Sequence, residues 1–378
     1  MKRLIATQIK EDLKEKIVFI TGPRQVGKTT LSQMLYPDAF TYLNFDNPQD
    51  RKLIITQNWN RKPSLIIFDE MHKMKNWKRW LKGIYDKEKG QGQFLVTGSA
   101  KLDTYKKVGD SLAGRYFSFR LYPLDLKELC SLDQYSETQK KGILQQLMAT
   151  SGFPEPYLKG QKIFYGRWKK THLDIILKQD IPDMENLRAA KNLEFLIELL
   201  RDKVGSPISY NSLAEDLQVN DKTIKRYLQI LENSYVIFKV TPYSKKIVGT
   251  IKKQPKYYFF DIARVKEESF RFENLVALSL LKEVHYRQDV LGEEINLFYL
   301  RNKKKLEIDF YLQGEAKDCL VEAKLSDEAE SPNFRIFAPY FPHAKKIQLV
   351  KNLKSEFLTK NHVHILKAHL WLSDFHAD

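Results

Sequence analysis

One short segment near the N-terminus constrains the fold more than any other part of the chain. The apolar, β-branched run Lys16–Thr21 (KIVFIT) predicts a buried strand, and GPRQVGKTT follows it at once. A helix is predicted over Thr30–Tyr36. A strand, a glycine-containing loop and a helix in this order predict an α/β domain. In such a domain, loop N–H groups and the helix N-terminus surround phosphate oxygens.

The loop fits the pattern G-x-x-x-x-G-K-[ST] of nucleotide-binding P-loops. Lys28 is expected to reach the β- and γ-phosphates, and the hydroxyl of Thr29 to ligate Mg²⁺. ATP and Mg²⁺ are therefore the expected cofactors. The residues expected to bind the nucleotide are Gly22, Pro23, Arg24, Gln25, Val26, Gly27, Lys28, Thr29 and Thr30.

A second motif follows the strand predicted at Leu65–Phe68 (LIIF). This strand runs into Asp69 and Glu70, as in a Walker B motif. The carboxyl ends of parallel strands face the ligand, so Asp69 is expected to hold Mg²⁺ through water. Glu70 is expected to polarise the water that attacks the γ-phosphate. A simple strand cap is the structural alternative, but the P-loop upstream favours the catalytic role.

Three further polar residues are candidates for the same site. The strand predicted at Gln93–Thr97 makes Thr97 and Ser99 candidate sensors of the γ-phosphate, although Ser99 could equally cap a helix. Arg115 precedes a strand predicted at Phe117–Leu121. An arginine there could stabilise transition-state charge, from the same chain or from a neighbouring subunit, or form a structural ion pair.

Five segments carry a family resemblance: TGPRQVGKTTL, LIIFDE, FLVTGSA, LAGRYFSFRLYPLDLKEL and SGFPEPYL. They resemble a bacterial and archaeal family of AAA-type P-loop ATPases, and the resemblance extends over nearly the whole chain. It implies ATP binding with slow hydrolysis, a winged-helix segment and a C-terminal domain of unknown function. Ser151 stands where the family more often has glycine.

The predicted elements and the resemblance together give an α/β fold of four parts. These are an AAA-type P-loop core with a parallel sheet (1–130), a helical lid or linker (131–191), a winged helix-turn-helix (192–262) and an α/β domain resembling restriction endonucleases (263–378).

A basic helix makes duplex DNA an expected partner. The chain has a formal charge of +16, which favours polyanions. Two helices are predicted at Tyr210–Leu217, capped by Ser209, and at Lys222–Glu232, capped by Asp221, ahead of a hairpin of Tyr235–Thr241 and Tyr257–Phe260. The expected phosphate contacts are Lys222, Lys225 and Arg226, with Lys245, Lys246, Lys252, Lys253 and Lys256 in or near the wing. Winged helices also bind proteins, which is the alternative.

The last third carries the pattern of a metal-dependent nuclease. Asp309 lies in the predicted strand EIDFYL, and Glu322 and Lys324 share one face of the strand CLVEAKL. This set resembles the PD-(D/E)xK pattern, in which two carboxylates hold Mg²⁺ or Mn²⁺ and the lysine positions the attacking water. Glu273 is expected as an additional ligand through water. A buried network without metal is the structural alternative.

Composition limits the remaining classes. Cys130 and Cys319 are too few and too far apart for a disulfide framework, and no apolar run approaches the ~18 residues of a membrane span. The sequence therefore predicts a cytoplasmic protein.

Two hypotheses follow from the sequence. The first is a Mg²⁺-dependent ATPase that acts on DNA, with metal-dependent cleavage by the C-terminal domain left open. The second is a nucleotide-dependent switch or adaptor with a protein-binding winged helix and an inactive C-terminal scaffold. A homo-oligomer and a different protein partner both stay open.

Overall fold

The computed structural model describes residues 3–88, 92–98, 112–131, 133–180, 187–244, 254–315, 317–326 and 329–375. The chain divides into two compact units. The first comprises Met1–Tyr122 with Asn233–Tyr235, and the second comprises Pro123–Glu232 with Val236–Asp378.

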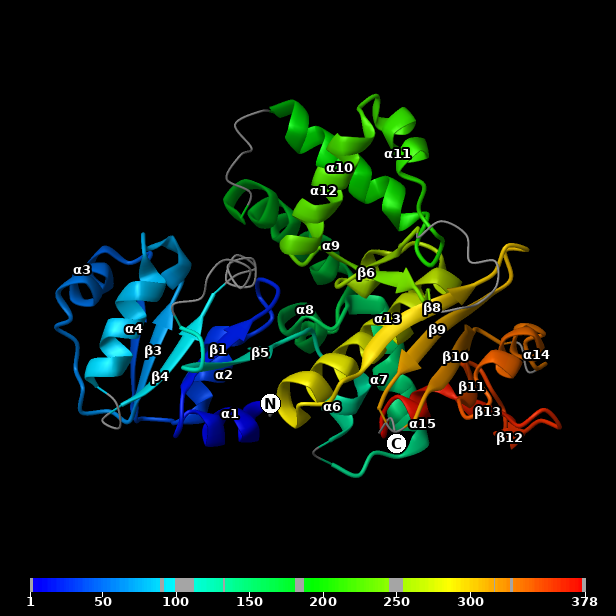
Figure 1. The fold of residues 1–378 in the computed structure, drawn as a ribbon, viewed down its shortest axis with the longest axis horizontal. Coiled ribbons are helices and arrows are strands. Elements are labelled where there is room, and N and C mark those ends of the chain that lie inside the picture. The colour runs from blue at the N-terminus through cyan, green and yellow to red at the C-terminus, as the bar shows by residue number, and fades with distance from the viewer. Residues whose placement is uncertain are drawn as a thin grey trace. The chain divides into compact units, whose positions relative to one another are not determined.

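The first unit is built on a five-stranded parallel sheet in the order β2-β3-β4-β1-β5 (Figure 1). Its strands are β1 (Ile17–Thr21), β2 (Phe40–Asn44), β3 (Leu65–Asp69), β4 (Gln93–Thr97) and β5 (Tyr116–Arg120). Its helices are α1 (Ala6–Asp12), α2 (Lys28–Leu35), α3 (Pro48–Thr56) and α4 (Trp77–Lys87). Both β1 and β3 are buried along their whole length, as their apolar sequences predict. The parallel arrangement brings the ends of β1, β3 and β4 to one edge.

Aromatic side chains fill the core of this unit. Phe68 on β3 meets Trp59 and Trp80 edge-on, at ring-centroid distances of 5.4 and 5.3 Å. Phe19 on β1 meets Trp77 of α4 at 5.9 Å. These contacts hold β1 and β3 rigidly, and the two strands carry the P-loop and the Walker B carboxylates at their ends.

Helices form the first half of the second unit. They are α6 (Leu126–Cys130), α7 (Glu137–Thr150), α8 (Pro154–Lys159), α9 (Lys162–Ile175), α10 (Leu187–Arg201), α11 (Tyr210–Leu217) and α12 (Asp221–Asn233). Ser209 caps α11 as predicted. The prediction that Asp221 caps α12 is wrong, because Asn220 accepts the backbone N–H of Thr223.

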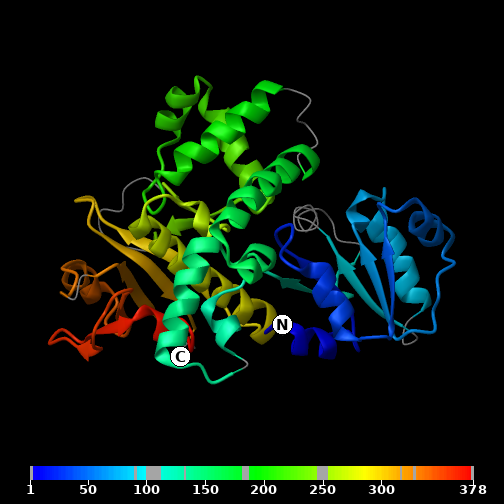
Figure 2. The same ribbon diagram turned by 180° about the vertical axis from the view of Figure 1, so that it is seen from behind.

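An eight-stranded sheet forms the second half, in the order β12-β13-β11-β10-β9-β8-β6-β7. Its strands are β6 (Ile237–Pro242), β7 (Lys256–Phe259), β8 (Asn296–Arg301), β9 (Glu307–Gln313), β10 (Cys319–Lys324), β11 (Lys345–Val350), β12 (Phe357–Leu358) and β13 (Val363–Lys367). Three helices accompany it: α13 (Glu268–Tyr286), α14 (Asn333–Phe337) and α15 (Ala368–Trp371). Figure 2 shows α7 alongside the long helix α13.

The hairpin expected to be a free wing belongs to this sheet. Thr241 and Pro242 of β6 pair in parallel with Phe298 and Tyr299 of β8. Every residue of β7 is buried, beginning with Lys256. The prediction that Lys256 is a phosphate-contacting wing lysine is therefore wrong. The other four wing lysines lie outside the described residues.

Ion pairs fasten the segment after the first unit to α13. Lys127 Nζ lies 2.7 Å from Glu283 Oε2, and Lys282 Nζ lies 2.6 Å from Glu128 Oε2. Leu124 also donates its N–H to the carbonyl of Gly152 at 2.7 Å. These contacts explain why residues 123–130 belong to the second unit. Among the described parts of the chain, no helix combines the length and apolar character that crossing a bilayer requires.

Candidate functional site

The P-loop folds as its glycines predict. Gly27 has a φ of 94°, in the left-handed region that favours glycine, and it immediately precedes α2. Gly22 has a φ of 144°, and a Cβ atom there would lie 2.0 Å from the carbonyl oxygen of Leu121. Both positions therefore require a residue without a side chain. Arg3, which the sequence analysis did not single out, supports the loop from behind through a hydrogen bond to the Val26 carbonyl at 3.1 Å.

Lys28 and Thr29 open α2 at the carboxyl edge of the sheet. The ammonium of Lys28 donates to the carbonyls of Gly22 and Pro23, at 2.9 and 2.7 Å. It therefore contacts the backbone of the P-loop. The hydroxyl of Thr29 donates to Oδ2 of Asp69 at 3.0 Å. The structure thus brings the two sequence motifs together.

Asp69 is the centre of a hydrogen-bond network. Oδ2 accepts from Thr29 and from the hydroxyl of Tyr42, the latter at 2.8 Å. Oδ1 accepts from the hydroxyl of Thr97 at 2.7 Å and from the N–H of Glu70 at 3.0 Å. Four donors on a buried carboxylate fix its orientation. A carboxylate fixed beside a threonine hydroxyl supplies the oxygen ligands that Mg²⁺ prefers, so Thr29 and Asp69 fit as the residues that would hold the ion.

Tyr42 is the residue of this network that sequence reasoning missed. Burial and the neighbouring Asp69 carboxylate raise the pKa of its hydroxyl well above its usual range, so the proton stays on Tyr42. Part of this could be predicted from the sequence, because Tyr42 lies two residues before the end of β2, the strand beside β3. The register of β2 on β3, in which Asn44 is opposite Asp69, is decided only by the pairing of the two strands in the sheet.

Glu70 lies directly after Asp69 in a left-handed conformation, with a φ of 56°. Burial raises its pKa, and the Asp69 carboxylate adds to the effect, whereas Lys73, Arg24 and Lys28 oppose it. A carboxylate with a raised pKa is a stronger base than an ordinary glutamate. This left-handed backbone conformation ends the extended run of β3 at Asp69 and turns the chain at Glu70.

The structure separates the other three candidates. Thr97 is fully buried, and its hydroxyl donates a hydrogen bond to Asp69. Ser99 lies outside the described residues. Arg115 pairs with Asp86 of α4 at 2.8 Å. It precedes Tyr116, which is opposite Ile17 at the start of β1, so it lies at the amino edge of the sheet. About 17 Å of strand separates that edge from the P-loop. Of the alternatives left open for Arg115, the structure shows the ion pair, with Asp86.

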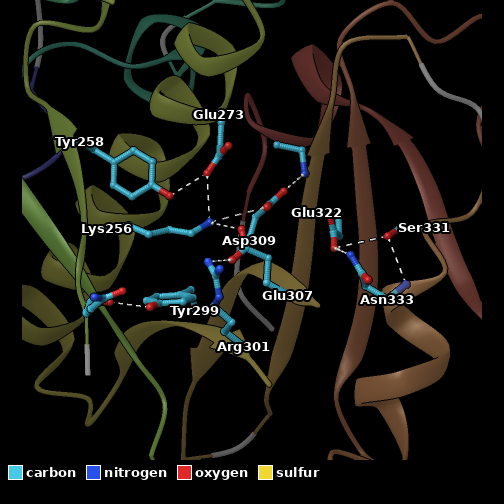
Figure 3. A network of polar contacts seen from close by, with 12 residues as sticks. Lys256, Tyr258, Glu273, Tyr299, Arg301, Glu307, Asp309, Glu322, Ser331 and Asn333 are labelled. Atoms are coloured by element: carbon cyan, nitrogen blue, oxygen red, sulfur yellow. Dashed lines mark hydrogen bonds and ion pairs between the residues drawn. The ribbon is translucent and has the colours of Figure 1, made fainter. Parts of the chain in front are cut away.

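Three carboxylates, those of Glu273, Glu307 and Asp309, surround the buried Lys256 (Figure 3). Lys256 Nζ lies 2.9 Å from Glu307 Oε1, 3.5 Å from Glu273 Oε1 and 3.9 Å from Asp309 Oδ1. The hydroxyl of Tyr258 donates to Glu273 at 2.8 Å. Burial lowers the pKa of Lys256, but the three carboxylates outweigh it and raise that pKa overall, so the lysine stays charged.

Glu322 faces a different set of donors. Lys324 Nζ lies 3.1 Å from its Oε2, and Ser331 Oγ and Asn333 Nδ2 lie 3.4 and 3.3 Å from its Oε1. Burial raises the pKa of Glu322 to about 8, with Asp309 adding to the shift and Lys324 opposing it. The raised pKa favours the protonated form of Glu322.

The predicted nuclease set is only partly assembled. Asp309, Glu322 and Lys324 lie on neighbouring strands as expected, whereas Glu273 is engaged by Tyr258 and Lys256. Within the described ranges, no three His, Cys, Asp or Glu side chains are grouped so that they could hold a metal ion. Lys256 and Lys324 contact the carboxylates expected to hold Mg²⁺ or Mn²⁺ at this C-terminal site.

The DNA-contact candidates share one exposed helix face. Lys222, Lys225 and Arg226 are exposed on α12, while Ile224, Leu228 and Leu231 are buried on its other side. The Lys225 ammonium lies 5.5 Å from the ring centroid of Tyr210. The amphipathic pattern thus leaves three cations on the solvent side.

Comparison with known proteins agrees with the geometry of the first unit. Residues 14–130 match the AAA domain family. This part of the chain is therefore similar to AAA-type P-loop domains. Residues 141–265 and 269–371 match two domains of unknown function, DUF8612 and DUF4143.

Two uncharacterized relatives match most of the chain. An uncharacterized protein of Methanocaldococcus jannaschii is 28% identical over 336 residues, covering 81% of this chain and 74% of its own. An uncharacterized protein of Mycobacterium tuberculosis is 24% identical, covering 82% and 70%.

Solved structures give weaker matches. Thermotoga maritima RuvB matches with a TM-score of 0.30 and 15% identity, over 62% of this chain and 87% of that one. Drosophila ORC bound to DNA gives a TM-score of 0.23 and 12% identity, over 66% and 88%. These scores are too low to establish a common overall fold.

Proposed function

We propose that the AAA domain hydrolyses ATP with Mg²⁺. The observation that carries this proposal is the Asp69 carboxylate, which joins the end of β3 to Thr29 of the P-loop with Glu70 beside it. Lys28 and the loop amides bind the phosphates, and Thr29 and Asp69 hold the ion. Mg²⁺, when bound, neutralises phosphate charge.

Glu70 is the proposed base for the attacking water. It polarises the water as the oxygen attacks the γ-phosphorus and the bond to the β-phosphate oxygen breaks, giving ADP and phosphate. Its raised pKa supports this role because the water proton needs an acceptor. Tyr42 and Thr97 position Asp69. Arg115 would act only on a nucleotide held by a second copy of the chain.

The test is steady-state ATP hydrolysis by Lys28→Ala beside Lys52→Ala. Both variants lose one lysine, but Lys52 is exposed on α3, away from the loop. We expect Lys28→Ala to lose roughly 10²-fold or more, the cost of removing one donor from developing charge. Equal activity of the two variants would refute the proposed site.

We further propose that α10, α11, α12 and the β6–β7 hairpin form a winged-helix module that binds duplex DNA. The exposed face of Lys222, Lys225 and Arg226 supports this, together with the chain's net charge of +16. The test is DNA affinity across a salt series. Affinity that does not change with salt would contradict phosphate contacts.

A nucleotide-dependent switch is the second candidate function. The Lys256 contacts favour it, because a cluster already neutralised by a lysine is poorly suited to cleave DNA. The test is cleavage of plasmid DNA with Mg²⁺ or Mn²⁺, with and without ATP, by the wild type beside Glu322→Ala and Lys28→Ala. The switch predicts intact plasmid in every lane. Cleavage lost in Glu322→Ala alone would overturn it.

A further inference from the structure

The C-terminal carboxylate cluster is saturated by the protein's own cations. Glu273, Glu307, Asp309 and Glu322 are its acids, and Lys256, Arg301 and Lys324 are its bases. Four acids face three bases, so at most one negative charge in the cluster is left uncompensated. The network is thus close to neutral without any metal ion.

Each oxygen of the two central carboxylates has a protein partner. Oδ1 of Asp309 faces Lys256, and Oδ2 accepts the N–H of Ala323 at 2.9 Å. The Glu322 oxygens face Lys324 on one side and Ser331 with Asn333 on the other. A divalent ion needs oxygens at about 2.0–2.6 Å and would have to displace these donors.

Lys256 is not a mobile surface side chain that could leave easily. It is completely buried, and its ammonium lies 5.3 Å from the ring centroid of Tyr299. The chain before it is fixed on two sides. The Tyr299 hydroxyl donates to the Gln254 carbonyl at 2.5 Å, and the N–H of Ile208 donates to the Pro255 carbonyl at 3.0 Å.

The segment between α10 and α11 closes the cluster on the side of Glu273. Gly205 lies so close that a Cβ atom there would be 2.5 Å from Oε2 of Glu273. Its φ of 73° also favours glycine. Pro207 then forms a β-bridge with Lys256. The proposed winged-helix module therefore supplies both the cover and the cation.

We propose that the Lys256 ammonium takes the place of a divalent cation in the C-terminal domain, so that the domain binds no metal at Asp309. The ammonium supplies the positive charge that a metal would otherwise give, and it ties β7 to β9 and α13. Two expectations follow. The wild type has no Asp309-dependent metal site, and removal of the ammonium creates one.

The experiment is Mn²⁺ binding, followed by electron paramagnetic resonance of the free ion, on full-length protein without nucleotide. The variants are the wild type, Asp309→Asn, Lys256→Met and the double variant Lys256→Met/Asp309→Asn. Methionine keeps the apolar stem of the lysine and removes its charge. Any Mn²⁺ at the P-loop is common to all four proteins and cancels in the comparison.

We expect the wild type and Asp309→Asn to bind equal amounts of Mn²⁺. Lys256→Met is expected to bind one more ion per chain, which the double variant loses. In EDTA the melting temperature of Lys256→Met is expected to be roughly 10 °C below that of the wild type, because the buried carboxylates have lost their charge partner. Addition of Mn²⁺ is expected to restore part of that difference.

Two results would overturn the proposal. One is wild-type Mn²⁺ binding that Asp309→Asn abolishes, a result that needs no Lys256 variant to fold. The other is a folded Lys256→Met that gains no Mn²⁺. Neither result depends on whether the AAA domain hydrolyses ATP.

Discussion

The hydroxyl of Thr29 lies 3.0 Å from the carboxylate of Asp69, although the two residues are 40 positions apart in the chain. This hydrogen bond links the P-loop helix to the end of β3. It joins the two halves of the proposed nucleotide site in one hydrogen-bond network.

Glu70→Gln should abolish hydrolysis and leave nucleotide binding intact. The amide keeps the size of the side chain but cannot accept a proton, so turnover is expected to fall roughly 10²–10⁴-fold. Turnover and the affinity for a fluorescent ATP analogue are the two measurements. A parallel loss of affinity would mean that Glu70 binds nucleotide instead.

Thr97→Val should destabilise the first unit. Valine has nearly the same shape, but it leaves Oδ1 of the buried Asp69 without its hydroxyl donor, at a cost of about 1–3 kcal/mol. Thr41→Val is the matched control, because its hydroxyl donates to the exposed Asn60 carbonyl. Denaturant unfolding should separate the two variants. A Thr97→Val protein as stable as the control would contradict the network.

Arg115→Ala tests whether a second copy completes the site. Arg115 lies at the sheet edge opposite the P-loop, so isolated chains should keep their activity when it is removed. If Arg115 acts between copies, wild-type activity per chain should rise with concentration. Mixing inactive Glu70→Gln with Arg115→Ala should then restore activity. Loss of activity in Arg115→Ala that neither concentration nor mixing changes would contradict this placement.

The basic face of α12 should control DNA affinity. Replacing Lys222, Lys225 and Arg226 by alanine is expected to reduce the salt dependence of log affinity by about three, or about one per phosphate contact. The matched control removes three exposed lysines elsewhere in the second unit, namely Lys141, Lys354 and Lys360. If both triple variants lose the same affinity, net charge alone attracts the DNA.

The second unit should lose stability as the pH rises. Glu322 has a pKa of about 8 in the folded chain, above the usual carboxyl value, so its proton stabilises the fold at low pH. This contribution is fully present below about pH 4.5 and is lost as the pH rises through 8, with a slope no steeper than about 1.4 kcal/mol per unit.

Glu322→Gln provides the control for that pH profile. Glutamine imitates the protonated acid, so thermal unfolding of the variant should change much less between pH 6 and 9. The groups that face Glu322 are Asp309 and Lys324, with Ser331 and Asn333 as neutral donors. An unchanged wild-type profile in Glu322→Gln would assign the pH dependence to another group.

The sequence by itself determined the elements that local chemistry fixes. Ile17–Thr21 is a buried strand because its residues are apolar and β-branched, and the glycines of the following loop permit backbone angles that other residues avoid. Ser209 caps α11 through a side chain and an N–H only three residues apart. Such interactions involve near neighbours, so the sequence pattern is sufficient to predict them.

Only the tertiary structure decided which distant charges meet. Arg115 is a candidate for the phosphate site from sequence alone, but it lies at the opposite end of the strands, because β1 and β5 run parallel and Arg115 precedes the start of β5. From the sequence, Lys256 is expected to be a solvent-exposed lysine in or near the wing, next to the strand predicted at Tyr257–Phe260. It is buried because β6 pairs with β8, and burial makes its ammonium the counter-ion of Glu273 and Glu307. A charge has no preferred sequence neighbour, and the fold alone determines which opposite charge it reaches.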